Sequence, residues 1–171
     1  MRVVLDTNVL VSGLLSPFGP PGEIVRLVST GLLSLCLDAR IVSEYRDVLA
    51  RPKFGFDPDA VTTLLDYLES SGEMVASQPL ATRLPDPDDE PFLEVALAAL
   101  ADALVTGNLG HYPPGARAGA AVLSPAELVE RYRSELGEFK AAVEAGLADP
   151  EEGRDSPLAE ANRRLGTTFR E

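Results

Sequence analysis

The chain has 171 residues, of which 45% are hydrophobic and 25% charged, values that fit one globular domain with a substantial core. Its formal net charge of −12 argues against a protein that holds nucleic acid by bulk electrostatics, because such binding uses Lys and Arg to neutralise phosphates. No apolar stretch reaches the roughly 18 residues of a membrane helix, and the start of the chain lacks a signal-peptide pattern. We therefore expect a cytoplasmic protein without a membrane partner.

The single cysteine and the single histidine restrict the chemistry further. Cys36 is the only cysteine, which excludes an intrachain disulfide and a cysteine-based zinc site. His111 is the only histidine, which excludes a metal site with two histidines and argues against a histidine-based triad.

Short apolar runs alternate with amphipathic segments along the chain. The run 3–5 is β-branched and fully apolar, as expected for a strand buried on both faces of a parallel sheet. Strands that alternate with helices predict an α/β fold with a parallel sheet and crossover connections. The pattern predicts strands at 3–5, 33–37, 74–76, 103–106 and 121–123, a helix or turn at 8–16, and helices at 23–29, 41–50, 59–70 and 92–101.

The last part of the chain also has helical signals. Ser124, Pro125 and Glu127 have the spacing of a helix start, with a capping side chain, a proline at the first position and a reciprocal acid. We expect further helices over 138–147 and 156–165, separated by a linker.

Three carboxylates and one amide fall at points that an α/β fold brings together. Asp6 follows the first strand, Glu44 lies on the helix after the second, Asp89 opens the long apolar helix, and Asn108 follows strand 103–106. Ligands of open α/β sheets bind at the carboxyl ends of the strands, and oxygen ligands suit Mg²⁺ or Mn²⁺. Such an ion polarises a phosphoryl oxygen and activates water. Each acid taken alone also fits a purely structural role at a helix start.

Four segments, in this order and spacing, resemble the PIN-domain family, and most closely its VapC-related branch of toxins from toxin–antitoxin pairs. They are VVLDTNVL (3–10), SEYRDVL (43–49), DPDDEPFLEVALA (86–98) and ADALVTGNL (101–109). The resemblance covers 1–135. It implies a three-layer α/β/α sandwich on a central parallel sheet, with 136–171 as a helical C-terminal extension. It also implies a Mg²⁺- or Mn²⁺-dependent ribonuclease that forms a homodimer or higher homo-oligomer and has a cognate antitoxin.

The same resemblance assigns roles to individual residues. Asp6, Glu44, Asp89 and Asn108 take the positions of the catalytic metal ligands, although the family usually has Asp where Asn108 stands, so metal affinity is expected to be lower. Thr7, Asn8 and Thr106 would orient the carboxylates. Among the other nearby acids, Asp86, Asp88, Glu94 and Asp102, the last ranks first as an additional ligand.

Basic residues supply candidate contacts to RNA. Arg40, Arg46, Arg51 and Lys53 fall within one short stretch, and His111 lies three residues after Asn108; an ordinary solvated surface is the alternative for both. Residues 146–154 resemble the C-terminal segment of small antitoxins, so the tail is expected to inhibit the site through Arg154, Arg163 or Arg164. A plain terminal extension or a dimer arm is the alternative.

Two other function classes stay open. One is a non-catalytic PIN-like module that binds RNA or protein, in which Asn108 marks the loss of metal. The other is a receiver-type phosphoryl-transfer regulator, which needs a lysine near the last strand, whereas this chain has only Lys53 and Lys140.

Overall fold

A computed structural model describes residues 1–148, and its centre is a five-stranded sheet in which every neighbouring pair is parallel. The strand order is β3-β2-β1-β4-β5, so the first strand of the chain lies in the middle of the sheet. The helix expected over 156–165 and residues 149–155 before it lie outside the described residues. The strands are β1 (Arg2–Leu5), β2 (Ser34–Leu37), β3 (Glu73–Met74), β4 (Ala103–Val105) and β5 (Val122–Leu123).

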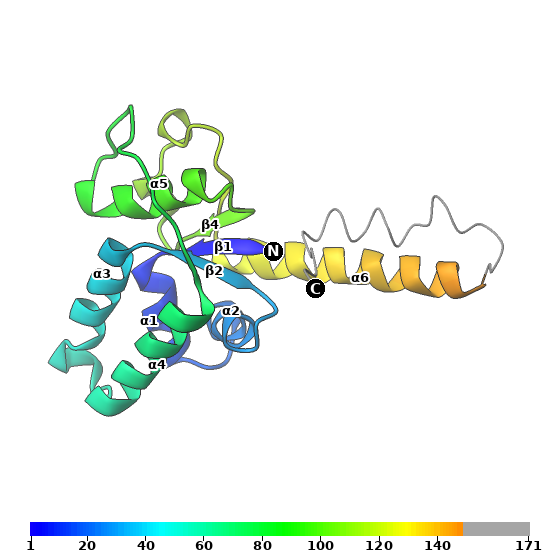
Figure 1. Cartoon of the computed structure of the whole chain (residues 1–171), viewed down its shortest axis with the longest axis horizontal. Coiled ribbons are helices and arrows are strands. Elements are labelled where there is room, and N and C mark those ends of the chain that lie inside the picture. Colours follow the sequence, from blue (N-terminus) through cyan, green and yellow to red (C-terminus); the bar gives the residue numbers. More distant parts are fainter. Residues whose placement is uncertain (149–171) are drawn as a thin grey trace.

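Helices cover both faces of the sheet, which confirms the predicted three-layer α/β/α sandwich. In Figure 1, α5 lies on one side of the strands, and α1, α3 and α4 lie on the other. The helices are α1 (Thr7–Leu15), α2 (Pro20–Ser29), α3 (Ala39–Leu49), α4 (Pro58–Ser71), α5 (Glu90–Ala98) and α6 (Pro125–Ala148), and the short 3₁₀ helices are η1 (Pro52–Phe54), η2 (Pro87–Asp89), η3 (Leu109–His111) and η4 (Pro114–Ala116).

The central strand is buried because it has a strand on each side and helices on both faces. Val3 is aligned with Leu35 of β2 and with Ala103 of β4, and all three side chains are buried. An apolar run without alternation is the pattern that such a strand requires. This arrangement fixes the position of Asp6, the residue that follows β1.

Side-chain caps begin several helices where the sequence predicts them. Asp6 Oδ1 accepts a hydrogen bond from Asn8 N at the start of α1, and Asp57 Oδ1 accepts from two main-chain N–H groups at the start of α4. At the start of α6, Ser124 Oγ accepts from Glu127 N and Glu127 Oε2 accepts from Ser124 N, which is the expected reciprocal pair. These caps confirm three predicted helix starts.

Two predictions about the helices were wrong in detail. The expected separate helix over 138–147 is the distal part of α6, which continues through Gly137 and in Figure 1 extends away from the sheet. The predicted boundary between 135 and 136 therefore falls inside one helix. Helix α2 begins at Pro20, earlier than expected, because proline is well accommodated in a first helical turn. None of the described helices is both long enough and apolar enough to cross a membrane.

Candidate functional site

The end of β1 and the end of β4 are joined by hydrogen bonds between residues far apart in the chain. Asp6 N donates to Val105 O at 2.9 Å, and Thr106 Oγ1 donates to Asp6 Oδ2 at 2.7 Å. Both Asp6 and Thr106 are buried. The carboxylate of Asp6 is therefore held in one orientation at the carboxyl edge of the sheet.

The turn after β4 is fastened to the start of α1 by Asn8. Asn8 Oδ1 accepts from Gly107 N at 2.8 Å, and Asn108 N donates to Thr106 Oγ1 at 2.9 Å. A Cβ at Gly107 would lie 3.0 Å from Asn8 Oδ1, so this close approach favours glycine. These contacts place Asn108, which is exposed, beside the segment that carries Asp6.

Glu44 comes to the same edge from α3. It lies in the second turn of that helix rather than near the first turn as expected, and Thr7 Oγ1 donates to its Oε1 at 2.5 Å. Partial burial raises the pKa of Glu44, the hydrogen bond from Thr7 opposes this shift, and the negative charges of Asp6, Asp88 and Asp89 add to it. Glu44 and Asp89 therefore interact electrostatically with each other and with Asp6.

Asp89 ends η2 and directly precedes α5, and it is buried. Burial raises the pKa of its carboxyl, the charge of Asp6 adds to the rise, and His111 beside it opposes the rise. His111 Nδ1 lies 2.9 Å from Asp89 Oδ2, at the distance of an ion pair, but the two atoms are not aligned as a hydrogen bond. Among the described residues, Asp89 Oδ2 is thus a buried acceptor without a hydrogen-bond partner.

Two buried tyrosines, which sequence reasoning did not single out, adjoin these acids. Tyr45 donates from its hydroxyl to Leu5 O at 2.5 Å. Tyr112 is fully buried, and its hydroxyl has no hydrogen-bond partner among the described residues. Burial, together with the charges of Asp6, Asp89 and Glu44, raises the pKa of Tyr112 far above its usual value, so its hydroxyl stays a proton donor. In the sequence, only its position directly after His111 places Tyr112 near the candidate site residues.

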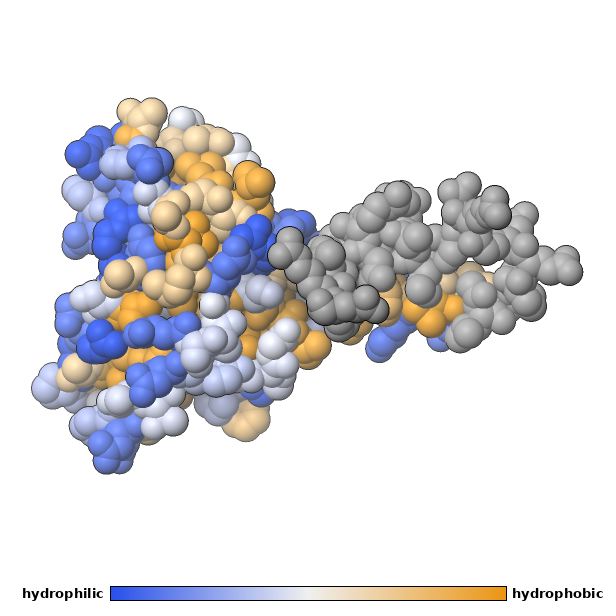
Figure 2. Space-filling view, in the orientation of Figure 1, coloured by the Kyte–Doolittle hydropathy of each residue, from blue (hydrophilic) through white to orange (hydrophobic). Residues whose placement is uncertain are grey.

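We call Asp6, Glu44, Asp89 and Asn108 the acidic site. Figure 2 shows an indentation of the surface at the side where the strands end, between the part that carries α5 and the part that carries α3. Hydrophilic residues lie on the side of this indentation that belongs to α5. A substrate can therefore approach this edge of the sheet from solvent.

The acidic site fits a hard divalent cation by the kind of donors it offers. Carboxylate and amide oxygens are the ligands that Mg²⁺ and Mn²⁺ prefer. The pKa values of Glu44 and Asp89 are raised mainly by burial and further by the charge of Asp6, and a cation would offset this negative charge. Asp89 Oδ2, which has no hydrogen-bond partner among the described residues, is an oxygen available to such a cation. Among residues 1–148, no three His, Cys, Asp or Glu side chains are already gathered as a metal-binding group.

Asp102, the first-ranked additional ligand, lies at the other edge of the sheet. It precedes β4, whereas Thr106 follows it. Its Oδ2 accepts from Arg2 N at 2.7 Å, next to the start of β1. The structure therefore does not bring Asp102 together with the acidic site.

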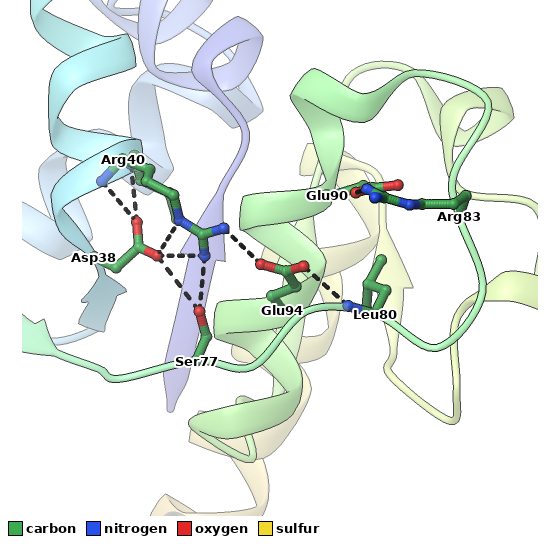
Figure 3. Close-up of polar contacts among 8 residues, drawn as sticks. Asp38, Arg40, Ser77, Leu80, Arg83, Glu90 and Glu94 are labelled. Atoms are coloured by element: carbon green, nitrogen blue, oxygen red, sulfur yellow. Dashed lines mark hydrogen bonds and ion pairs between the residues drawn. The ribbon is translucent and has the colours of Figure 1, made fainter.

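Arg40, the first of the basic candidates, is engaged by protein acceptors. Its guanidinium donates to Asp38 Oδ2, to Glu94 Oε2 at 2.7 Å and to Ser77 Oγ at 2.8 Å (Figure 3). Asp38 also follows a strand at the carboxyl edge, but it caps α3 and pairs with Arg40. A guanidinium with three acceptors is poorly placed to bind RNA.

The other basic candidates lie on the surface. Arg46 pairs with Glu69 of α4 at 3.1 Å, and Lys53 Nζ lies 4.8 Å from the centre of the Phe54 ring. Arg51 is exposed. His111 is the one basic candidate that contacts the acidic site, and Arg154, Arg163 and Arg164 lie outside the described residues.

A parallel α/β/α sandwich with carboxylates from three chain segments at the carboxyl edge of its central strands defines a class of acid-lined α/β domains. The chain belongs to the PIN domain family, whose family model matches residues 2–110. This match spans all four residues of the acidic site. Among proteins with curated functions, none gives a significant match to the sequence.

One similar solved structure is the crystal structure of VapBC2 from Rickettsia felis bound to a DNA fragment from their promoter. The matched chain is 16% identical in sequence, and the match covers 72% of the present chain and 98% of that chain, with a TM-score of 0.52. At this level of identity the match supports the fold.

Proposed function

We propose that this protein is a ribonuclease that depends on Mg²⁺ or Mn²⁺ and acts as the toxin of a toxin–antitoxin pair. The observation that carries the proposal is the convergence of Asp6, Glu44 and Asp89, from three separate segments, on one edge of the sheet. Glu44 and Asp89 both have pKa values raised by burial and, in addition, by the negative charge of Asp6. A bound cation relieves this repulsion, and the family supports the same assignment.

The proposed roles follow from the contacts of each residue. Asp6, Glu44 and Asp89 supply charged oxygen ligands, and Asn108 supplies a neutral carbonyl oxygen. Thr106 and Thr7 hold the carboxylates of Asp6 and Glu44 in position through hydrogen bonds. When bound, the cation supplies the positive charge that stabilises the phosphoryl oxygens and lowers the pKa of an attacking water.

His111 is proposed to act where the site meets solvent. Its Nδ1 contacts Asp89, and 43% of its side chain is exposed. The imidazole can therefore contact Asp89 through Nδ1 on one side and meet a phosphate oxygen with its other nitrogen. It thereby orients the substrate next to the carboxylates.

The partners are part of the proposal. The solved VapBC2 structure is a complex bound to promoter DNA, and we propose by analogy that a cognate antitoxin protein binds the present chain. We further propose that the protein works in the cytoplasm as a homo-oligomer. The net charge of −12 implies that RNA is held by the cation and a few basic side chains rather than by a broad basic surface.

Cleavage of a labelled RNA in the presence of Mn²⁺ tests the proposal. We expect the full-length protein to cleave and Asp89→Asn to lose at least about 100-fold in rate, because a charged ligand of the ion is lost. Asp47→Asn is the matched control, since Asp47 is an exposed acid of α3 outside the acidic site. EDTA should abolish cleavage.

The same experiment separates the main alternative. A non-catalytic binding module would bind RNA without cleaving it, and its affinity for RNA would not change on Asp89→Asn. Cleavage that survives both EDTA and Asp89→Asn would overturn the metal-dependent mechanism.

A further inference from the structure

Helix α3, which carries Glu44, and helix α5, which Asp89 directly precedes, are also joined by an ion pair. Arg40 Nη1 of α3 donates to Glu94 Oε2 of α5 at 2.7 Å, across 54 positions of sequence. Glu94 is only 4% exposed, and its other oxygen accepts from Leu80 N at 3.0 Å. Both oxygens of this buried carboxylate are therefore used.

The ion pair has a defined position relative to the acidic site. Arg40 and Glu44 are four residues apart, so they lie on the same face of α3, one turn apart. Glu94 follows Asp89 by five residues along α5, a rise of about 7 Å. In Figure 3, Glu94 lies below Glu90 on α5. Helix α3 lies on the opposite side of β1 and runs upward from Arg40. Hence Glu44 lies toward the end of α5 where Asp89 is.

Two pairs of charged side chains on α3 and on the segment of α5 interact with opposite signs. At the level of Arg40 and Glu94 the charges attract, whereas Glu44 and Asp89 are both acids, and each carries a share of the local negative charge. Without a cation, the repulsion between Glu44 and Asp89 favours a larger separation of α3 and α5. The attraction between Arg40 and Glu94 opposes that separation.

We propose that Arg40 and Glu94 are positioning residues that hold α3 and α5 at the separation at which Glu44 and Asp89 can bind one divalent cation. We call this pair the Arg40–Glu94 bridge. This proposal rests on the proposed function of the acidic site. It deepens that function because it assigns a part in metal affinity to two residues that are not metal ligands. Ser77 and Asp38 fix the guanidinium, so that it presents Nη1 to Glu94.

Mn²⁺ binding to the full-length protein, measured by calorimetric titration, tests the bridge. We expect Arg40→Gln to weaken Mn²⁺ binding about tenfold, since groups that orient ligands usually have effects of that order. Arg40→Lys, which keeps the charge, should recover part of the loss. Glu94→Gln removes the opposite charge and should act like Arg40→Gln, which provides a second variant if the first does not fold.

Arg46→Gln is the matched control for these variants. Arg46 is an arginine of the same helix, but its ion pair reaches Glu69 of α4 and not α5. We expect it to leave Mn²⁺ affinity unchanged. Wild-type affinity in Arg40→Gln, or an equal loss in Arg46→Gln, would overturn the bridge.

A measurement without metal separates failure of the bridge from failure of the proposed function. If wild-type protein does not bind Mn²⁺, the proposed function fails, and thermal unfolding in EDTA still tests the bridge. Asp89→Asn relieves repulsion, and we expect its gain in Tm to fall to roughly half in an Arg40→Gln background, where the helices can relax apart. Additive shifts in Tm would overturn the bridge.

Discussion

The hydroxyl of Thr7 donates a hydrogen bond to Glu44 Oε1 at 2.5 Å, and this contact joins the first helix to the third at the acidic site. Thr7 directly follows Asp6 and begins α1, and it orients a carboxylate 37 positions further along the chain. Two acids are thereby positioned by one short segment.

Removal of this hydroxyl should change metal binding in a pH-dependent way. The hydrogen bond lowers the pKa of Glu44 against the larger rise caused by burial. In Thr7→Val the pKa of Glu44 should rise further, so that its carboxyl stays protonated to a higher pH and metal affinity falls most under mildly acidic conditions. Mn²⁺ titrations at pH 5.5 and pH 8 check this. Thr62→Val, which removes a hydroxyl that donates to Pro58 O on the exposed α4, should have no such effect.

Asp89→Asn should stabilise the protein when no metal is present. Because the pKa of Asp89 is raised in the folded state, its charged form opposes folding, and stability is lost as pH rises through that pKa. The asparagine variant should therefore have the higher Tm in EDTA at pH 7, and the difference should vanish below about pH 3, where Asp89 is neutral in both the folded and the unfolded state. A gain of about 1 kcal/mol would raise Tm by roughly 2–4 °C in a protein of this size. An equal or lower Tm at pH 7 would contradict the raised pKa.

The two buried tyrosines should respond in opposite ways to the same substitution. Tyr112→Phe removes a buried hydroxyl without a hydrogen-bond partner, so we expect a neutral to stabilising effect of up to about 1 kcal/mol in the metal-free protein. Tyr45→Phe removes the donor to Leu5 O and leaves a buried carbonyl with one bond fewer, at a cost of about 1–2 kcal/mol. Denaturant unfolding of both variants in EDTA gives the comparison. A destabilised Tyr112→Phe would indicate a partner for that hydroxyl.

Asn108→Asp should strengthen metal binding and weaken the metal-free fold. The added carboxylate places a fourth negative charge beside Asp6, Glu44 and Asp89. This charge strengthens the binding of a divalent cation, and without the cation it adds repulsion that destabilises the fold. Mn²⁺ titration and thermal unfolding with and without EDTA give the two opposite shifts. Asn108→Ala should weaken metal binding, which separates the role of the amide oxygen from that of the exposed turn.

Much of the fold could be predicted because its signals are local. The unbroken apolar run of β1 and the caps at Asp57 and Ser124 all stand in a few consecutive residues. The continuity of α6 was missed because Gly137 and the polar residues around it have the pattern of a helix end, although a glycine within a long exposed helix costs only about 1 kcal/mol.

The contacts of the charged side chains were harder to predict. Arg40 had the pattern of a free RNA-binding arginine, but its partner Glu94 is 54 positions away and only the packing of α3 on α5 brings them together. The Tyr112 hydroxyl has no hydrogen-bond partner among the described residues, so no pair of polar residues in the sequence points to it. The position of Asp102 could have been predicted, since it precedes the predicted strand 103–106, whereas Asp6 and Asn108 follow their strands.

The strand order has a consequence for biosynthesis. β1 leaves the ribosome first, yet it lies between β2 and β4 in the finished sheet, and Asp6 receives its hydrogen bond from Thr106, 100 positions later. Because chains are made from the N-terminus, a nascent polypeptide that ends before β4 has the carboxylates but not the framework that fixes Asp6. The chemistry is therefore assembled late in translation, after nearly the whole globular part has emerged.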